Sequence, residues 1–166
     1  MTKLKKNIWF TMASIIAGLV LGFFVWMNAI QNDFRTLKNG CNFAWTQLEN
    51  EIKHQSSYFP DIIRQFPENI KRDNMKTFHT IYSQISSSQT LNEVTDSYQN
   101  LYSFLEDIAP SSDFNNDNFL TLNLRIKDEA GLFNQHVSLY NSQLSVFPKH
   151  KVAKYFNLTQ LSKFNI

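Results

Sequence analysis

The sequence contains few of the residues from which binding and catalytic sites are usually built. Cys41 is the single cysteine among 166 residues, and glycine, proline and histidine occur only four times each. One cysteine excludes an internal disulfide and leaves no second thiol for a metal cluster. Few glycines and prolines leave few turns, and no glycine-rich phosphate-binding loop is present. The chain is therefore expected to consist of long packed elements.

Charge of either sign is missing from one long stretch near the N-terminus. Residues 7–32 contain no Asp, Glu, Lys or Arg, and nearly all positions from 8 to 30 are apolar. About 20 apolar residues, each rising about 1.5 Å, are enough for a helix to cross the bilayer core. We therefore predict a short basic N-terminus at residues 1–6 and a single-pass transmembrane helix at residues 7–32.

A cleaved leader is the alternative interpretation of this stretch. The hydrophobic part of a signal peptide is usually about 7–15 residues long, roughly half of what is present here. The nearest small-residue site, Met27-Asn28-Ala29, has no small residue two positions before the cut. Polar residues precede Cys41, where a lipoprotein site needs aliphatic ones. These features favour an uncleaved anchor.

The residues in and around the anchor suggest an orientation and a pairing surface. Lys3, Lys5 and Lys6 precede the helix and mixed charge follows it, so the positive-inside rule favours a cytoplasmic N-terminus and an exported domain. The reverse orientation stays open, because the difference in charge is small. Small residues at four-residue spacing form a face that could pack against another membrane helix; the alternative is that they reflect only the high frequency of small residues in membrane helices. These residues are Ser14, Gly18 and Gly22.

Beyond the anchor, apolar residues recur every three or four positions, which indicates amphipathic helices. The first stripe continues from the membrane helix without a break, and a bend is expected at Pro60. No stretch alternates in the manner of a strand. Four stripes that must cover one another predict an all-α fold, in which the transmembrane helix continues into an antiparallel, coiled-coil-like four-helix bundle over residues 33–148. The stripes are Phe34, Leu37, Cys41, Ala44, Leu48, Ile52, Gln55, Phe59, Ile62 and Phe66; Met75, Phe78, Tyr82 and Ile85; Leu91, Val94, Tyr98, Leu101, Leu105 and Ile108; and Phe119, Leu122, Ile126, Ala130, Phe133, Val137, Tyr140, Leu144 and Phe147.

Features at the ends of these helices add detail. Thr90–Glu93 has the form of a capping box, which marks the start of the third helix. Residues 149–166 form a basic and aromatic tail, and no acidic residue follows Glu129. An up-down-up-down order returns the fourth helix to the membrane, so this tail is a candidate for contact with lipid. The alternative is a tail folded back on the bundle, with its lysines in water. The candidate lipid-contacting residues are Lys149, Lys151 and Lys154.

The sequence contains no catalytic constellation. The four histidines form no His-x-x-x-His pair, the single Glu-x-x-His spacing (Glu51 to His54) has no second pair to complete a metal site, and most acidic residues fall on outward faces. Residues 33–166 carry 13 Lys and Arg against 14 Asp and Glu, a balance that argues against nucleic-acid binding. We therefore expect a protein that is not an enzyme and that has no cofactor, metal, small-molecule substrate or nucleic-acid partner. Trp45 is expected to pack in the core.

Several short motifs follow one another in a definite order. They are Ala44-Trp45-Thr46-Gln47-Leu48, Phe59-Pro60-Asp61-Ile62-Ile63, Asn118-Phe119-Leu120-Thr121-Leu122, Arg125-Ile126, Phe133-Asn134, Tyr140-Asn141 and Phe147-Pro148. In order and spacing they resemble the A-W-x-Q-I, L-I-P-N-L-V, N-F-L-x-L, E-N-R-I, Y-N and F-P motifs of the LemA family, across about residues 30 to 160. The matching positions that we interpret as structural are Ala44, Trp45, Gln47, Pro60, Asn118, Phe119, Leu120, Arg125, Asn134, Tyr140, Asn141, Phe147 and Pro148.

The resemblance implies a membrane helix with a bundle, in the bacterial inner (cytoplasmic) membrane, and no established enzymatic activity. It gives Pro60 the role of bending the first helix. It also places Asn134 and Asn141 on one helix flank, where each amide could bond across to a neighbouring helix. The sequence departs from the family at the charged positions near residues 54–57 and 130–132. Family descriptions often place the bundle inside, so both orientations stay open.

Two functions compete on this basis. The first is a non-enzymatic, single-pass membrane protein whose bundle binds other membrane or envelope proteins. The second is a self-associating scaffold at the membrane surface, which organises or shapes the bilayer through membrane lipids and homo-oligomers. A third hypothesis, an unrecognised hydrolase or metal-dependent enzyme, has no motif in its favour.

Overall fold

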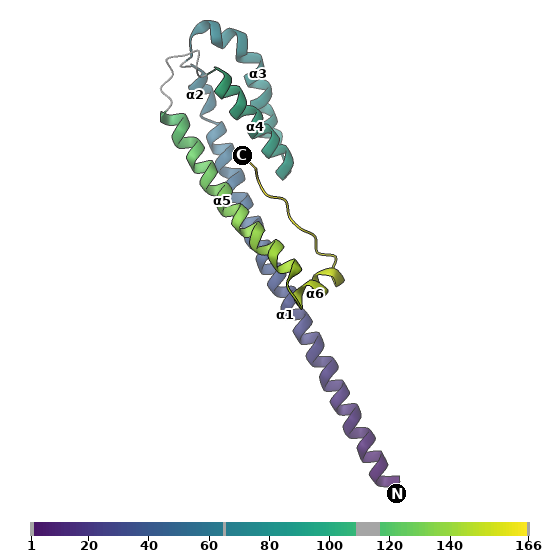
Figure 1. The fold of residues 1–166 in the computed structure, drawn as a ribbon. Coiled ribbons are helices and arrows are strands. Elements are labelled where there is room, and N and C mark those ends of the chain that lie inside the picture. Colours follow the sequence, from purple (N-terminus) through teal and green to yellow (C-terminus); the bar gives the residue numbers. More distant parts are fainter. Residues whose placement is uncertain (1, 65, 109–116, 166) are drawn as a thin grey trace. The chain divides into compact units, whose positions relative to one another are not determined.

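The computed structural model describes residues 2–64, 66–108 and 117–165, and within these ranges the chain is helical or irregular, with no strand. The fold is all-α, as predicted, with a long apolar helix at the N-terminus followed by further helices (Figure 1). The helices are α1 (Thr2–Ser56), α2 (Phe59–Arg64), α3 (Glu68–Ser87), α4 (Leu91–Ile108), α5 (Asp117–Ser145) and α6 (Lys149–Tyr155).

The first helix is the longest element and includes the whole apolar stretch. It contains no proline, and its glycines lie within otherwise strong helical sequence. Its end is set by Pro60, which lacks the N–H that would bond the carbonyl of Ser56 and whose ring would clash with that carbonyl. The predicted bend at Pro60 is therefore a break: α1 stops at Ser56, and α2 starts again at Phe59 with Pro60 in its first turn.

The chain divides into two compact units. The anchor unit comprises Met1–Asn39 and Leu139–Leu161, and the bundle unit comprises Gly40–Ser138 and Ser162–Ile166. These groups differ from the predicted segments 33–148 and 149–166, because the end of α5 packs with the anchor and the last tail residues pack with the bundle.

In the bundle unit, α1 and α5 run antiparallel, and α3 and α4 form a helical hairpin (Figure 1). The ring of Trp45 lies 5.8 Å from that of Phe133, and Gly40 faces His136, so later residues of α1 meet earlier residues of α5. Each of the four helices supplies fully buried aliphatic or aromatic side chains to one core. Members of this core include Leu48 and Ile52 on α1, Phe78 and Ile85 on α3, Val94 and Leu101 on α4, and Ile126 and Val137 on α5.

The predicted stripes agree with the buried residues except at a few positions. On α4, every predicted position from Val94 to Ile108 is buried, whereas Met75 on α3 is exposed and Ile81 takes its place in the core. Phe147 is also exposed rather than buried, since it lies beyond the end of α5. The side chains of Ile62, Phe119 and Leu122 lie outside what the structure describes.

In the anchor unit, the end of α5 and the short helix α6 lie beside α1 (Figure 1). Phe34 and Tyr140 meet edge to face with ring centroids 6.1 Å apart. One ion pair joins α6 to α1, between the Lys149 Nζ and the Asp33 Oδ2 at 3.2 Å. The chain that follows α5 thus returns to the C-terminal end of the apolar run, as the up-down-up-down order predicts.

Candidate functional site

A hollow lies at the corner between α5 and α6 in the anchor unit. It is an open pocket of about 480 Å³ whose walls are mostly apolar. Two of its wall residues expose much of their surface to the surroundings: Phe147 is 76% exposed and Tyr155 is 70% exposed. The α1 wall consists of Phe23, Phe24, Trp26 and Met27, and the other wall consists of Phe147, Pro148, Lys151, Val152 and Tyr155.

This pocket lies at the end of the apolar run of α1. From Ile8 to Ile30 the helix rises about 33 Å, close to the ~30 Å thickness of a bilayer core. The α1 wall of the pocket, residues 23–27, is therefore in the last turns of the run, where Trp and Tyr are typical of the interface between lipid and water. Phe147 and Tyr155 lie at the same level, because they line the same pocket.

The three lysines that the sequence predicted to contact lipid have different surroundings. Lys149 pairs with Asp33 and is only partly exposed, so its charge is already balanced within the protein. Lys151 lines the apolar pocket, and Lys154 is exposed on α6. The geometry thus leaves Lys151 and Lys154 as the cations that are available to an external anion.

Asn134 and Asn141 hold the tail, and not a neighbouring helix as the family resemblance suggested. In the bundle unit, Asn134 donates from Nδ2 to the carbonyl of Phe164 (2.7 Å) and accepts from its N–H at Oδ1 (2.8 Å). In the anchor unit, Asn141 makes the same pair of bonds with Leu161, both at 2.9 Å. A primary amide carries one donor side and one acceptor side, so each asparagine satisfies a full backbone unit of extended chain.

The remaining positions of the family-like motifs have structural or surface roles. Ala44 is buried, and Trp45 is half-buried against Phe133. Gln47 and Arg125 are exposed, so they do not contribute to the core. Pro60 separates two helices, and Tyr140 packs on Phe34. Asn118, Phe119 and Leu120 belong to the first turn of α5, but their side chains lie outside the described residues.

The small-residue face of the anchor is open. A Cβ added at Gly18 or Gly22 would meet nothing within 4 Å, and the Ser14 hydroxyl donates to the carbonyl of Phe10 at 3.0 Å. Nothing within the described chain covers this face. The face is therefore available to a second helix, although the structure itself contains no such helix.

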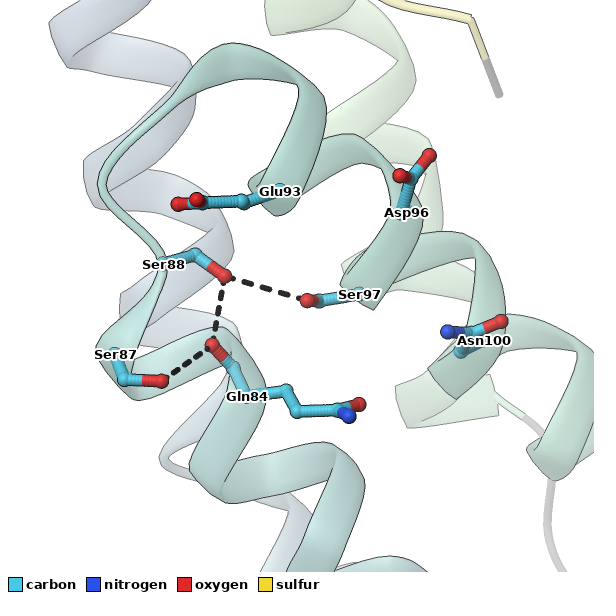
Figure 2. A pocket seen from close by; sticks show the side chains of 7 residues that line it. All are labelled: Gln84, Ser87, Ser88, Glu93, Asp96, Ser97 and Asn100. Carbon is cyan, nitrogen blue, oxygen red and sulfur yellow. Dashed lines mark hydrogen bonds between the residues drawn. The ribbon is translucent and has the colours of Figure 1, made fainter.

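A second hollow, of about 380 Å³, lies at the turn between α3 and α4 and is polar (Figure 2). Its buried hydroxyls satisfy one another: Ser88 donates to the carbonyl of Gln84 at 2.7 Å, and its oxygen lies 3.2 Å from that of Ser97. Glu93 closes the helix end, because its carboxylate accepts from the N–H groups of Gln89 and Thr90 at 2.9 and 3.1 Å. The predicted capping box is confirmed. These bonds lower the pKa of Glu93, so this carboxylate is an acceptor and not a general acid.

Other polar and titratable side chains of the bundle unit also have surroundings that suit a structural role. Burial raises the pKa of the Cys41 thiol, which keeps the thiol protonated and poorly nucleophilic. Burial also raises the pKa of Tyr98, whose hydroxyl donates to Asn123 at 2.9 Å. Gln55, the polar member of the first stripe, is buried and donates to Glu51 at 2.8 Å. In the ranges that the structure describes, no three His, Cys, Asp or Glu side chains are grouped as a metal would require.

Sequence reasoning missed the residues that receive the tail. Phe164 is 2% exposed and packs on Tyr98, with ring centroids 6.3 Å apart, and Gln99 donates to the carbonyl of Asn165 at 2.9 Å. The signal for them was weak, since extended chain has no helical period. The available sign was that Leu161 and Phe164 belong to the apolar residues interleaved with charge in this basic and aromatic tail.

Together these observations define a class: a helical protein with one N-terminal apolar helix that is long and apolar enough to cross a membrane, a property that a signal sequence also has. Comparison with protein-family models, with curated proteins and with solved structures found no match to the chain.

Proposed function

We propose that this chain is a non-enzymatic, single-pass membrane protein that works as a scaffold at the membrane surface, with the corner between α5 and α6 resting on anionic lipid. The single observation that carries the proposal is the apolar pocket at the end of the apolar run, with Lys151 on its wall and Phe147 and Tyr155 exposed beside it. Aromatic rings with basic side chains around them are the composition of interfacial lipid contacts.

The same pocket supports an uncleaved anchor over a signal sequence. Phe23, Phe24, Trp26 and Met27 form one of its walls. Removal of the apolar segment would take this wall away and leave the opposite wall, with Val152 now buried at 3%, open to water. A segment that the folded unit packs against is better explained as a permanent part of the protein. Within this proposal the membrane is the bacterial inner membrane, and the likeness to LemA-family proteins concerns this anchored helical architecture.

The corner adds to what the anchor supplies. The apolar helix already holds the chain in the bilayer, so contact at the corner serves to fix how the anchor unit stands on the surface. Each lysine near an anionic surface contributes about 1 kcal/mol, and Lys151 and Lys154 are exposed at the corner, whereas Lys149 is paired with Asp33. Two such charges together with two exposed aromatic rings are enough to keep the corner at the interface.

The test measures the depth of the corner in a bilayer. The full chain carries Cys41→Ala and Phe147→Cys, is labelled with an environment-sensitive fluorophore, and is reconstituted with lipids that bear a nitroxide quencher just below the headgroup. The matched control is Leu139→Cys, which is also exposed in the anchor unit but lies about 12 Å away along the α5 direction. The proposal predicts strong quenching at position 147 and weak quenching at position 139.

The dependence on charge completes this test. With Lys151→Gln and Lys154→Gln, quenching at position 147 should fall in anionic bilayers and stay unchanged in zwitterionic ones. Equal quenching at positions 139 and 147, in either type of bilayer, would contradict a corner that rests on lipid.

Binding of other membrane or envelope proteins is the second candidate function. It is favoured by large apolar side chains that the bundle unit leaves exposed, namely Phe43, Leu124 and Leu132. Affinity capture from a detergent extract, with wild type and Leu132→Glu compared, tests it. A partner that wild type retains and the variant loses would support this function, and recovery of the bait alone with both would count against it.

A further inference from the structure

The bundle unit contains a groove between α4 and α5 that is filled by the end of the chain. Phe164 is the buried residue of this segment, while Ser162, Lys163 and Asn165 on either side of it are exposed. The segment therefore enters the groove by one aromatic side chain and by its backbone. Ser162–Ile166 joins the bundle unit as a short separate piece, remote in sequence from the helices that receive it.

The residues of the groove contact both the backbone and one side chain of the bound segment. Asn134 bonds the N–H and the carbonyl of Phe164 at 2.8 and 2.7 Å, and Gln99 donates to the next carbonyl at 2.9 Å. Bonds to the main chain supply affinity for any extended segment other than proline at that position. The pocket beside Tyr98 supplies specificity for an aromatic ring. Peptide-binding sites combine affinity and specificity in this way: bonds to the main chain supply affinity, and a side-chain pocket supplies specificity.

The segment is tied to its groove by a stretch without helix. After α6 ends at Tyr155, the described chain to residue 165 contains no further helix, and Asn157 turns the backbone with φ of 52°. The residues that form the groove, on α4 and α5, do not include this stretch. An occupant with the same sequence from elsewhere would make the same contacts, because exchange of an identical element preserves every bond.

We propose that this groove is a peptide-binding site whose partner is the tail of a second copy of this chain, so that neighbouring copies exchange residues 161–165, the bonds between Leu161 and Asn141 included. The occupant is chosen because its sequence is the one seen to fit. Anchored copies in one membrane meet at a higher concentration than free copies, so that the tail of a neighbour competes with each copy's own linked tail. Exchange of tails between copies does not require contact between the corner and lipid.

The experiment joins a groove on one copy to a tail on another. Two differently tagged full-length chains, both with Cys41→Ala, carry Gln99→Cys and Asn165→Cys respectively, and both positions are exposed. They are co-expressed and treated in membranes with a short bis-maleimide, which adds to one thiol at each end. A single chain with both cysteines reports the contact within one copy. The proposal predicts a cross-linked species that carries both tags, and about tenfold less of it when the tail copy also has Phe164→Ala.

Two controls make the outcome decisive. Lys76→Cys on the exposed surface of α3 replaces Gln99→Cys to measure random collision, and Asn134→Leu in the groove copy removes both bonds to the tail without loss of bulk. Exchange is overturned if the double-cysteine chain cross-links internally while the two copies never join, or if Lys76→Cys joins as well as Gln99→Cys. An adduct of Cys at position 99 with a different protein also overturns it and assigns the groove to that protein.

Discussion

At the turn between α3 and α4, one carboxylate accepts from two backbone N–H groups that would otherwise have no partner. Glu93 receives the N–H groups of Gln89 and Thr90, and the Thr90 hydroxyl receives the N–H of Glu93 at 3.3 Å. The bonds from Gln89 and Thr90 hold the pKa of Glu93 below its ordinary value of 4.5. A carboxyl whose pKa is lowered on folding stabilises the folded state above its unfolded pKa, and this contribution is lost as the pH falls through the folded pKa.

We therefore expect the start of α4 to loosen in acid, at pH values below about 4.5, in wild type but not further in Glu93→Gln. Protection factors for the Gln89 and Thr90 amides, which correct for the intrinsic effect of pH on exchange, measure this directly. Thr90→Ala should lower protection at all pH values, with a cost of about 1 kcal/mol for the lost cap. Asp128→Asn, an exposed change on α5, controls for net charge. If the protection of these amides still fell at low pH in Glu93→Gln, Glu93 would not be the group responsible for the loss.

At the scale of the elements, apolar periodicity predicted the helices and their buried faces, because local sequence determines both. The predicted buried positions on α4 are all buried from Val94 to Ile108, because a helix fixes which residues share a face. Pro60 marked the end of the first long helix for a local steric reason, although the break falls at Ser56, four residues earlier. The apolar stripe predicts a buried Phe147, but α5 ends two residues earlier, at Ser145, and Phe147 is exposed.

The contacts of the tail were beyond prediction from the sequence. Asn134 and Phe164 are 30 residues apart, and Asn141 and Leu161 are 20 apart. Extended chain that bonds to side-chain amides carries no repeating apolar pattern, and an asparagine suits a turn or a surface equally well. The pair of Lys149 with Asp33 is of the same kind, since it depends on the return of α5 to α1 and not on local spacing.

The exposed small-residue face of α1 leads to a prediction about the anchor as an element. Because a Cβ at Gly18 has nothing within 4 Å, Gly18→Leu should leave the fold of the single chain unchanged. If Ser14, Gly18 and Gly22 form a packing face, the same change should prevent close approach of two anchors and weaken their association in the bilayer. A fluorescence-transfer assay between labelled anchors in vesicles measures this. Leu19→Ala, next to the face, is the control, and equal association in both variants would exclude the face.

At the scale of the whole molecule, the two proposals concern different units: lipid contact concerns the anchor unit, and tail exchange concerns the groove of the bundle unit. The anchor unit holds the features on which the proposed lipid contact rests: the apolar helix, the pocket at its end and the exposed Lys151 and Lys154. The bundle unit holds the groove and the exposed apolar side chains that suit proteins. Lipid contact can therefore fail without loss of the groove, and the reverse also holds, so each proposal is tested by changes that leave the other intact.

If α1 spans a membrane, as proposed, the side on which the bundle unit lies decides which partners it can meet. Lys3, Lys5 and Lys6 precede the anchor, so the positive-inside rule predicts a cytoplasmic N-terminus and an exported bundle. With Cys41→Ala and Ser162→Cys, an exposed position, a membrane-impermeant maleimide should label intact spheroplasts before lysis. Thr2→Cys is the matched control and should be labelled only after lysis. The opposite pattern would place the bundle in the cytoplasm, and the exchange of tails would then take place on the inner face.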